Sequence, residues 1–295
     1  MKVSVIICSY GRPASLAKCL ACVDAEVSLY SGSEIVLVYN DNDPATGEAM
    51  KTFATTAKAP VKITCATKRG LSVARNVGVN NASGDLLVFT DDDCYMQPGY
   101  FGAMLAEMET HPEYGYGGGG VHDACYNAPG TTHISQKNVV PPRTLVGAGV
   151  FGGCNMFFRR EIFEKLGGFR EDMGASSGKS FVGAEDLEMT TRANFSGYSG
   201  VLLPGPVVIH DHGRKPGSKE LIDLDRLYNI ARGSFYAHML VRNIHEIWSF
   251  WAATAAPKNG KMTRRQIVAL QQEFYGAAEY LKYCLENNID THMLG

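Results

Sequence analysis

The stretch LLVFTDDD, residues 86–93, places three consecutive aspartates directly after a short apolar run. The run follows a Gly-Asp turn pair at 84–85, and its length and composition are typical of a buried β-strand. The carboxylates of Asp91, Asp92 and Asp93 therefore emerge at the carboxyl end of a strand, where open α/β sheets bind ligands. Three like charges are unfavourable unless a cation or polar ligand compensates them, and such oxygens suit Mg²⁺ or Mn²⁺. A solvated acidic turn is the alternative interpretation.

The first hundred residues repeat a pattern of strand followed by helix. Repeated βα units of this length indicate a mostly parallel sheet with helices on both faces. Strands are expected at residues 3–8, 34–39, 61–66 and 86–90, and helices from 13 onward, over 71–82 and around 101–108.

Beyond residue 112 the repeat gives way to longer connections. Four consecutive glycines at 117–120 and the proline pair at 141–142 indicate loops, and residues 146–158 predict another buried strand region. The later expectations are a helix at 160–166, a Gly- and Ser-rich loop at 174–183, a helix from 185 to about 195, strand pieces at 200–203 and 207–210, and helices at 219–241, around 248–251 and at 263–286.

Composition excludes some classes of protein. The chain has 295 residues and a formal net charge of -2, so it lacks the basic excess expected of a nucleic-acid-binding protein. Its first apolar run is too soon interrupted for a signal peptide, and no apolar run approaches the roughly 18 residues that span a bilayer. The sequence therefore predicts a cytoplasmic protein, with work at the inner face of the membrane left open.

Four segments in register resemble the family 2 inverting glycosyltransferases of the GT-A fold. The resemblance extends from residue 3 to about 212 and implies a GT-A-like α/β fold with a helical C-terminal extension. The segments are VIICSYGRP at 5–13, RGLSVARN at 69–76, GDLLVFTDDD at 84–93 and GAEDLE at 183–188. The divisions it implies are a nucleotide-sugar-binding half at 1–112, an acceptor-binding half with the catalytic base at 113–215 and the extension at 216–295.

The resemblance implies a metal ion, Mn²⁺ or Mg²⁺, at the acidic triplet. Asp91 and Asp93 would be the family's D-x-D pair, with Asp91 on the ribose, Asp93 on the metal and Asp92 nearby in the nucleotide site. A histidine from later in the chain usually joins the metal. His210 and His212 follow an apolar strand, and His210 is preferred because it comes first off that strand. A surface turn is the alternative for both.

The nucleotide should lie over the ends of the first two strands. The resemblance assigns Ser9, Tyr10 and Arg12 to this site from the first strand's loop, and Asn40 and Asp41 from the second strand's end. The family often has an acidic residue at the position of Asn40 to accept the N3–H of uracil, whereas an amide both accepts and donates. A UDP-sugar is the expected donor.

Inversion by a single displacement requires a base that removes the proton of the acceptor hydroxyl. The resemblance assigns this role to Asp186, places Glu185 and Asn155 at the acceptor, and brings Arg75 to the nucleotide. Without the resemblance, Asp186 would be interpreted as a helix N-cap and Arg75 as a solvated helix residue.

The sequence thus predicts a hexosyltransferase-like, inverting, metal-dependent enzyme that transfers a sugar to a hydroxyl acceptor such as a glycan or lipid-linked glycan. A non-catalytic nucleotide-sugar-binding protein and a sugar nucleotidyltransferase are the alternatives. A sugar nucleotidyltransferase requires a Gly-rich, basic loop directly after the first strand, and residues 9–13 do not form such a loop. The C-terminal helices leave open a peripheral membrane contact or a homodimer.

Overall fold

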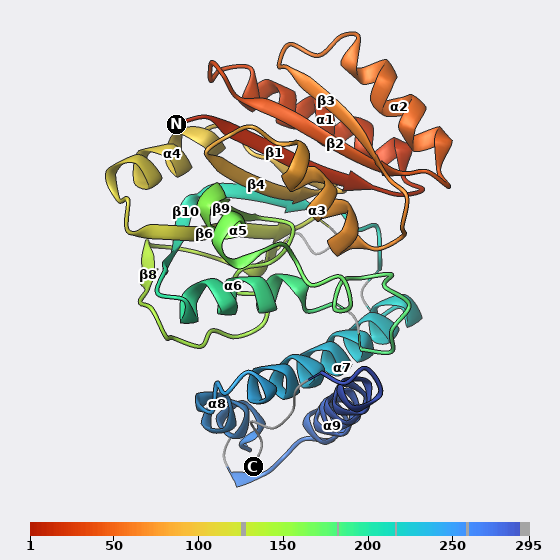
Figure 1. The fold of residues 1–295 in the computed structure, drawn as a ribbon, viewed down its shortest axis with the longest axis vertical. Helices are drawn as coiled ribbons and strands as arrows, with labels where there is room; N and C mark the ends of the chain where they lie inside the picture. The colour runs from red at the N-terminus through yellow and green to blue at the C-terminus, as the bar shows by residue number, and fades with distance from the viewer. Residues whose placement is uncertain (125–127, 182, 216, 258–259, 290–295) are drawn as a thin grey trace.

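A computed structural model describes residues 1–124, 128–181, 183–215, 217–257 and 260–289 (Figure 1). In chain order its elements are β1 (Val3–Ser9), α1 (Pro13–Val27), β2 (Glu34–Asn40), α2 (Pro44–Ala54), β3 (Val61–Ala66), α3 (Leu71–Asn81), β4 (Leu86–Asp91), β5 (Cys94–Met96), α4 (Tyr100–Thr110), β6 (Tyr114–Asp123), β7 (Ala128–Thr132), β8 (Asn138–Val140), β9 (Met156–Arg159), α5 (Arg160–Leu166), α6 (Glu185–Phe195), β10 (Ser199–His210), α7 (Lys219–Val241), α8 (Glu246–Ala255) and α9 (Arg264–Glu286).

The described strands form one sheet in the order β3-β2-β1-β4-β9-β6-β10-β5, with β7 beside β6 and β8 beside β10. Strands β3, β2, β1 and β4 are parallel to one another, and β6 is parallel to β10. Strand β9 lies between β4 and β6 and is antiparallel to both, so the sheet as a whole is mixed. The expected α/β class with flanking helices and C-terminal helices is confirmed (Figure 1).

Alternate residues of β1 serve two hydrophobic layers. Val5 and Ile7 pack with Leu16 of α1 on one face of the sheet, whereas Ile6 packs with Val73 of α3 on the other. Successive side chains of a strand point to opposite faces, and here helices cover both. For this reason β1 is a continuous apolar run. The packing on both faces also fixes the end of β1, where polar residues follow.

The glycine run at 117–120 lies in the central strand β6, so the expectation of a loop there was wrong. A Cβ atom on Gly117 would collide with the ring of Phe157, and one on Gly119 with the carbonyl oxygen of Pro206. These glycines are therefore required by the close approach of neighbouring chain segments, not by a turn.

The expectation of a buried strand over 146–158 was largely wrong, because only Met156–Arg159 is extended. The residues before it form turns, one of which is closed by a hydrogen bond from the Asn155 amide to the Gly152 carbonyl, at 2.9 Å. The two expected strand pieces at 200–203 and 207–210 are one strand, β10, whose register shifts between Leu203 and Val207. Two prolines in that interval lack the N–H that a regular ladder uses.

Helix α2 was not anticipated from the sequence, which indicated only a turn at 40–44. Its start nevertheless carries a local signal: Asp43 precedes Pro44 and accepts a hydrogen bond from the backbone N–H of Thr46, at 3.3 Å. An aspartate N-cap followed by proline at the first helical position is typical of a helix start.

Helices α7, α8 and α9 pack around a hydrophobic cluster that includes Phe235, Trp251 and Tyr280, and Phe181 and Leu187 from the region of α6 also belong to it. Gly233 of α7 faces the backbone of α9, and Gly276 of α9 faces the backbone of α7, so the two helices approach closely. In Figure 1 these helices lie beyond α6, on the side away from β3.

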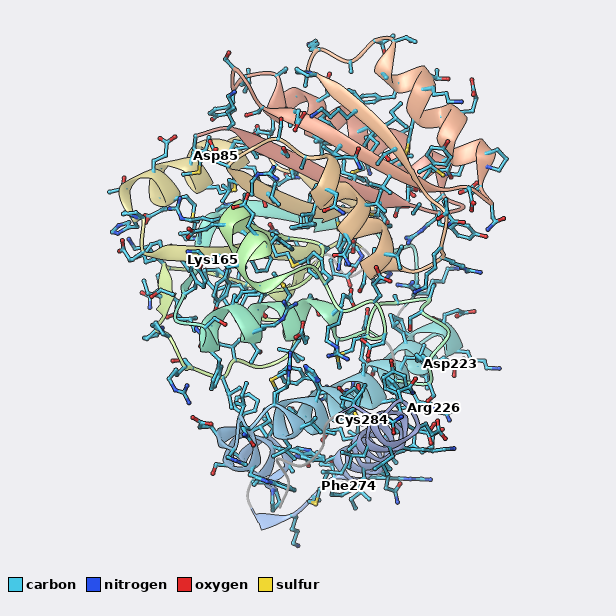
Figure 2. The ribbon with its side chains drawn as sticks, in the orientation of Figure 1. Asp85, Lys165, Asp223, Arg226, Phe274 and Cys284 are labelled. Atoms are coloured by element: carbon cyan, nitrogen blue, oxygen red, sulfur yellow. The ribbon has the colours of Figure 1, made fainter. Side chains whose placement is uncertain are left out.

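The aromatic stretch at 248–251 belongs to α8, where Trp251 is buried and Trp248 is exposed. Figure 2 places the exposed Phe274 at the outer edge of the same helical unit. No helix among the described residues combines the length and apolar character needed to cross a bilayer. Membrane contact or dimerisation through these helices stays a prediction.

Candidate active site

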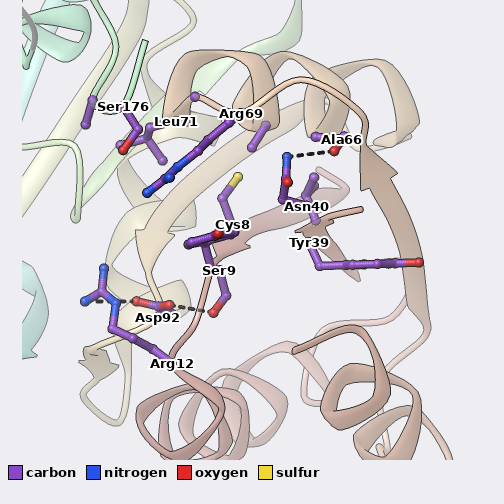
Figure 3. A pocket seen from close by; sticks show the side chains of 15 residues that line it. Cys8, Ser9, Arg12, Tyr39, Asn40, Ala66, Arg69, Leu71, Asp92 and Ser176 are labelled. Atoms are coloured by element: carbon purple, nitrogen blue, oxygen red, sulfur yellow. Dashed lines mark hydrogen bonds and ion pairs between the residues drawn. The ribbon is translucent and has the colours of Figure 1, made fainter. Parts of the chain in front are cut away.

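A cavity of about 210 Å³ opens where β1 and β2 end (Figure 3). Its lining includes five residues expected at the nucleotide: Ser9, Tyr10, Arg12, Asn40 and Asp92. They meet because β1, β2 and β4 are adjacent parallel strands, whose carboxyl ends lie along the same edge of the sheet. The cavity is therefore the candidate donor site.

Arg69 and Tyr10 form one wall of the cavity. The guanidinium carbon of Arg69 lies 4.7 Å from the centroid of the Tyr10 ring, and both side chains are exposed. The loop at 174–181 closes another side, with Ser176 in the lining and the Ala175 carbonyl accepting from the Leu71 amide at 2.9 Å. A planar base can stack on such groups. Sequence analysis assigned no role to Arg69, although it begins the RGLSVARN segment.

Asn40 joins the ends of β2 and β3. Its Nδ2 donates to the Ala66 carbonyl oxygen at 2.9 Å, and its Oδ1 accepts from the Asn42 amide at 3.2 Å. Ala66 and Asn40 both line the cavity (Figure 3), whereas the side chain of Asp41 is exposed. The amide of Asn40 is thus held in place at the cavity wall, and base contact by Asn40 or Asp41 stays a prediction.

If Asn40 contacts the base, Asn40→Ala should weaken binding of the free nucleoside diphosphate by about 1–3 kcal/mol, the cost of a lost buried hydrogen-bond partner. Calorimetric titration measures this loss. Asn42→Ala is the matched control, because it removes only the side-chain Nδ2 that donates to Asn40 Oδ1 at 3.3 Å and lies outside the cavity lining. An unchanged dissociation constant in a folded Asn40→Ala protein would place the base elsewhere.

Asp92 and Asp93 have different surroundings despite being adjacent. Asp92 is buried and accepts a hydrogen bond from Ser9 Oγ at 2.5 Å, and burial raises the pKa of Asp92 to about 6. Asp93 Oδ2 accepts from Arg12 Nη1 at 2.5 Å. Burial would raise the pKa of Asp93, but His210 and Arg12 together hold it below its usual value. Asp92 therefore orients Ser9, while Asp93 keeps its negative charge.

The structure separates the two histidines that follow β10. His210 Nε2 lies 3.4 Å from Asp93 Oδ1, whereas His212 Nε2 lies 3.0 Å from Asp123 Oδ2. Burial alone would lower the pKa of His210, but Asp93 and other nearby anionic groups raise it to about 9. Of the two, His210 is the one placed beside the acidic triplet.

The acidic triplet fits a divalent cation. Carboxylate oxygens of Asp91 and Asp93 belong to a group whose ligand atoms all lie within 4.8 Å of one another. That spacing allows both carboxylates to reach one ion, and hard oxygen donors are what Mg²⁺ and Mn²⁺ prefer.

Arg75 is buried inside the site, so its alternative interpretation as a solvated residue was wrong. Its Nη1 donates to Glu185 Oε1 at 2.8 Å, and its Nη2 donates to the Gly153 carbonyl at 3.0 Å and lies 3.3 Å from Asp91 Oδ1. The guanidinium thus joins the acidic triplet to the start of α6. The expected contact of Arg75 with the nucleotide stays a prediction.

Asp186 lies in the first turn of α6, whose N-cap is Ala184, so the interpretation of Asp186 as the N-cap was wrong. Its Oδ2 accepts from the Gly153 amide at 2.8 Å and its Oδ1 from the Leu187 amide at 2.7 Å. Burial raises the pKa of Asp186, and burial also raises the pKa of Glu185 to about 7. The Oε2 atom of Glu185 is buried without a hydrogen-bond partner among the described residues.

Asn155 is buried, and both its Oδ1 and its Nδ2 form hydrogen bonds within the protein. Tyr100 Oη donates to its Oδ1 at 2.6 Å, and its Nδ2 donates to the carbonyl oxygens of Gly120 and Pro206 at 2.9 and 3.0 Å. These contacts anchor the turn that carries Gly153 to β6 and β10. Acceptor contact by Asn155 or Glu185 stays a prediction.

Comparison with known proteins gives a family match. The profile described as Glycosyl transferase family 2 matches residues 4–167. A glycosyltransferase of Haloferax volcanii, AglE, is 26% identical over 248 residues, which are 81% of this chain and 75% of AglE. The glucosyl-dolichyl phosphate glucuronosyltransferase of the same organism is 26% identical over 198 residues, 61% of this chain and 59% of its own.

Solved structures share the fold at low identity. The mannosyltransferase PcManGT from Pyrobaculum calidifontis, in complex with GDP-Man and Mn²⁺, aligns with a TM-score of 0.63 at 18% identity, over 96% of this chain and 87% of its own. Residues 1–349 of TarS from S. aureus, in complex with UDP-GlcNAc, align with a TM-score of 0.57 at 16% identity, over 99% of this chain and 90% of its own.

Proposed function

Because the chain belongs to glycosyl transferase family 2 and has the fold of the GT-A glycosyltransferases, we propose that it is an inverting, metal-dependent, hexosyltransferase-like enzyme. It transfers a sugar from a nucleoside diphosphate donor to a hydroxyl acceptor. One observation carries this proposal: Arg75 joins Asp91 of the acidic triplet to Glu185, next to Asp186. A donor site and a candidate base are thereby held in one rigid arrangement.

The donor lies in the cavity at the ends of β1 and β2, with its base near Tyr10, Arg69 and Asn40. A UDP-sugar is the preferred donor, and the complexes of related folds with GDP-Man and UDP-GlcNAc support a nucleoside diphosphate sugar in general. In this arrangement residues 1–112 bind the donor, residues 113–215 supply the acceptor side and its base, and residues 216–295 form an extension to both.

Charge builds on the distal phosphate as the bond to the sugar breaks. A divalent cation, Mn²⁺ or Mg²⁺, held by Asp93 and His210 beside Asp91, supplies electrostatic stabilisation of that charge when bound. Asp186 takes the proton of the acceptor hydroxyl, whose oxygen bonds to the anomeric carbon on the face opposite the departing diphosphate. Arg75 positions Asp186 indirectly, because it binds the carbonyl of Gly153, whose amide binds Asp186.

The acceptor is a hydroxyl of a glycan, with a lipid-linked glycan as the favoured class. The name of the dolichyl phosphate glucuronosyltransferase supports this class, and the exposed Trp248 and Phe274 of the C-terminal helices are apolar groups that could meet a lipid. A non-catalytic nucleotide-sugar-binding protein is the competing proposal, and it predicts donor binding without turnover.

A panel of nucleotide sugars, screened by thermal shift with and without Mn²⁺, tests the donor. A ligand that binds the native state raises the melting temperature, so the correct pair of donor and metal should stand out. Transfer to a glycan acceptor, followed by NMR of the product's anomeric configuration, tests inversion. Binding without transfer to any hydroxyl acceptor would favour the non-catalytic alternative, and retained configuration would overturn the mechanism.

Asp93→Asn should abolish the Mn²⁺-dependent part of donor binding while the fold persists, because it removes one anionic ligand at the end of β4. The measurement is donor affinity at increasing Mn²⁺. Asp85→Asn, at the opposite end of the same strand (Figure 2), is the matched control and should keep the Mn²⁺ dependence. The assignment of Asp93 is wrong if its variant responds to Mn²⁺ as the parent protein does.

A further inference from the structure

Two cysteine thiols and a histidine imidazole lie together beside the acidic triplet. The two thiols have no role in the proposed transfer chemistry. Strands β5 and β10 pair so that Cys94 lies directly opposite His210. Side chains directly opposite in an antiparallel pair share one face and are close neighbours. Cys154, from the turn before β9, completes the group, and the ligand atoms of Cys94, Cys154 and His210 all lie within 4.8 Å of one another.

The spacing of these donors suits a tetrahedral metal site. With zinc bonds of about 2.0–2.3 Å, the ligand atoms of a tetrahedron are about 3.3–3.8 Å apart. Asp93 Oδ1 lies 3.4 Å from His210 Nε2 and 3.9 Å from Cys94 Sγ, which are edges of about this length. The other carboxylate oxygen of Asp93 is taken by Arg12, so Oδ1 is the oxygen that faces the group.

The surroundings hold these donors in place. Cys94 is fully buried within a strand, and Cys154 is fixed by its neighbour Asn155, whose side chain is bonded to Tyr100, Gly120 and Pro206. His210 retains about a quarter of its side-chain exposure, 27%, and provides the side from which an ion enters. Two thiols and an imidazole are the donors that select Zn²⁺ over Mg²⁺ or Mn²⁺.

We propose that Cys94, Cys154 and His210 form a Zn²⁺ site, with Asp93 Oδ1 as its fourth ligand. On binding, the thiol protons pass to the solvent and no electrons are exchanged. The site overlaps the proposed Mn²⁺ or Mg²⁺ position because His210 and Asp93 serve both ions. Bound Zn²⁺ therefore occupies both side chains, so they cannot hold Mn²⁺ or Mg²⁺, and it inhibits nucleotide binding. This consequence rests on the proposed function.

Zinc binding is measured on the reduced full chain by competition with a chromophoric chelator. We expect one tight equivalent, weakened at least about 10-fold in Cys154→Ala, because loss of a ligand should cost no less than loss of a supporting contact. Cys65→Ala, another partly buried cysteine on β3, is the matched control and should keep the tight equivalent. Equal zinc affinity in the parent protein and Cys154→Ala would overturn the proposal.

Cobalt(II) gives a readout that does not depend on any variant folding. Co²⁺ in place of Zn²⁺ should show intense thiolate-to-metal charge-transfer absorption in the parent protein, and this absorption should disappear when Zn²⁺ is added. Its absence from the parent protein would overturn the proposal. Titration of the nucleoside diphosphate with Mn²⁺, before and after one equivalent of Zn²⁺, then tests the competition. Zinc binding without competition would overturn the shared use of His210 and Asp93, and nucleotide binding that fails even without Zn²⁺ would instead contradict the proposed function.

Discussion

Asp186→Asn should reduce sugar transfer by about 10²–10⁴-fold, the usual contribution of a general base. Asparagine keeps the shape of the side chain, but its single carbonyl oxygen can accept from only one of the Gly153 and Leu187 amides, which bond to different carboxylate oxygens of Asp186. The loss of one hydrogen bond costs about 1 kcal/mol, so the start of α6 should persist. Donor and Mn²⁺ affinity should change by no more than a few-fold, because the proposed donor and metal contacts belong to the acidic triplet and the first-strand loop. Initial rates with a glycan acceptor and donor titrations measure the two effects separately.

Two variants sharpen this test. Asp223→Asn removes an exposed carboxylate on α7 (Figure 2) and should leave the rate unchanged. Glu185→Gln removes the neighbouring acid, whose burial raises its pKa to about 7. If Asp186→Asn transfers sugar at nearly the parent rate while Glu185→Gln does not, the base is Glu185 and the assignment of Asp186 fails.

The pH dependence of the rate has a definite sign. A general base acts only when deprotonated, and burial raises the pKa of Asp186 above its ordinary value. The rate should therefore fall as pH is lowered through that raised pKa and level off above it. Glu185 interacts with Asp186, so the acidic limb belongs to the pair. A pH–rate profile measured over the range in which the protein stays folded tests this, and a flat acidic limb would contradict it.

Arg75→Met should destabilise the protein by about 3–5 kcal/mol, the cost of leaving buried charge without its partner. Arg75 is buried, and its loss strands the carboxylate of Glu185, the carboxylate of Asp91 and the carbonyl of Gly153. Denaturant unfolding should be followed well above pH 7. The pKa of Glu185 is about 7 beside Arg75, and loss of the guanidinium raises it further, so at lower pH a protonated Glu185 would offset part of the destabilisation.

Arg69→Met is the matched control, since Arg69 is an exposed arginine of the same segment that lines the cavity. It should leave the free energy of unfolding within about 0.5 kcal/mol of the parent protein, as surface changes usually do, while weakening nucleotide binding. Arg75→Met that unfolds like the parent protein would show that Arg75 does not organise the site.

Local sequence patterns determined much of the structure of residues 1–112. The apolar runs at 3–8, 34–39, 61–66 and 86–90 are strands because both faces of the parallel sheet are covered, so each run is continuous in sequence. Parallel strands also bring their carboxyl ends to one edge. For that reason the sequence alone predicts that the residues following the runs, including Ser9, Asn40 and Asp92, lie together.

The structure after residue 112 depends on contacts between segments that are distant in the sequence. Local periodicity does not encode such contacts. The glycines at 117–120 look like a loop until Phe157 and Pro206 are seen to occupy the space that their side chains would need. His210 and His212 are equivalent by pattern, and only the positions of Asp93 and Asp123 separate them.

Arg75 and Cys154 show the same dependence on tertiary structure. Arg75 lies on a short amphipathic helix whose sequence is compatible with solvent exposure, and it becomes the centre of the site only because Gly153 and Glu185 arrive from the far half of the chain. Cys94 and Cys154 are sixty residues apart, and it is the pairing of β5 with β10 and the turn before β9 that bring them to His210. The local sequence determines which strands form. Burial and long-range hydrogen bonding set the order of those strands in the sheet, and this order decides which side chains can act together.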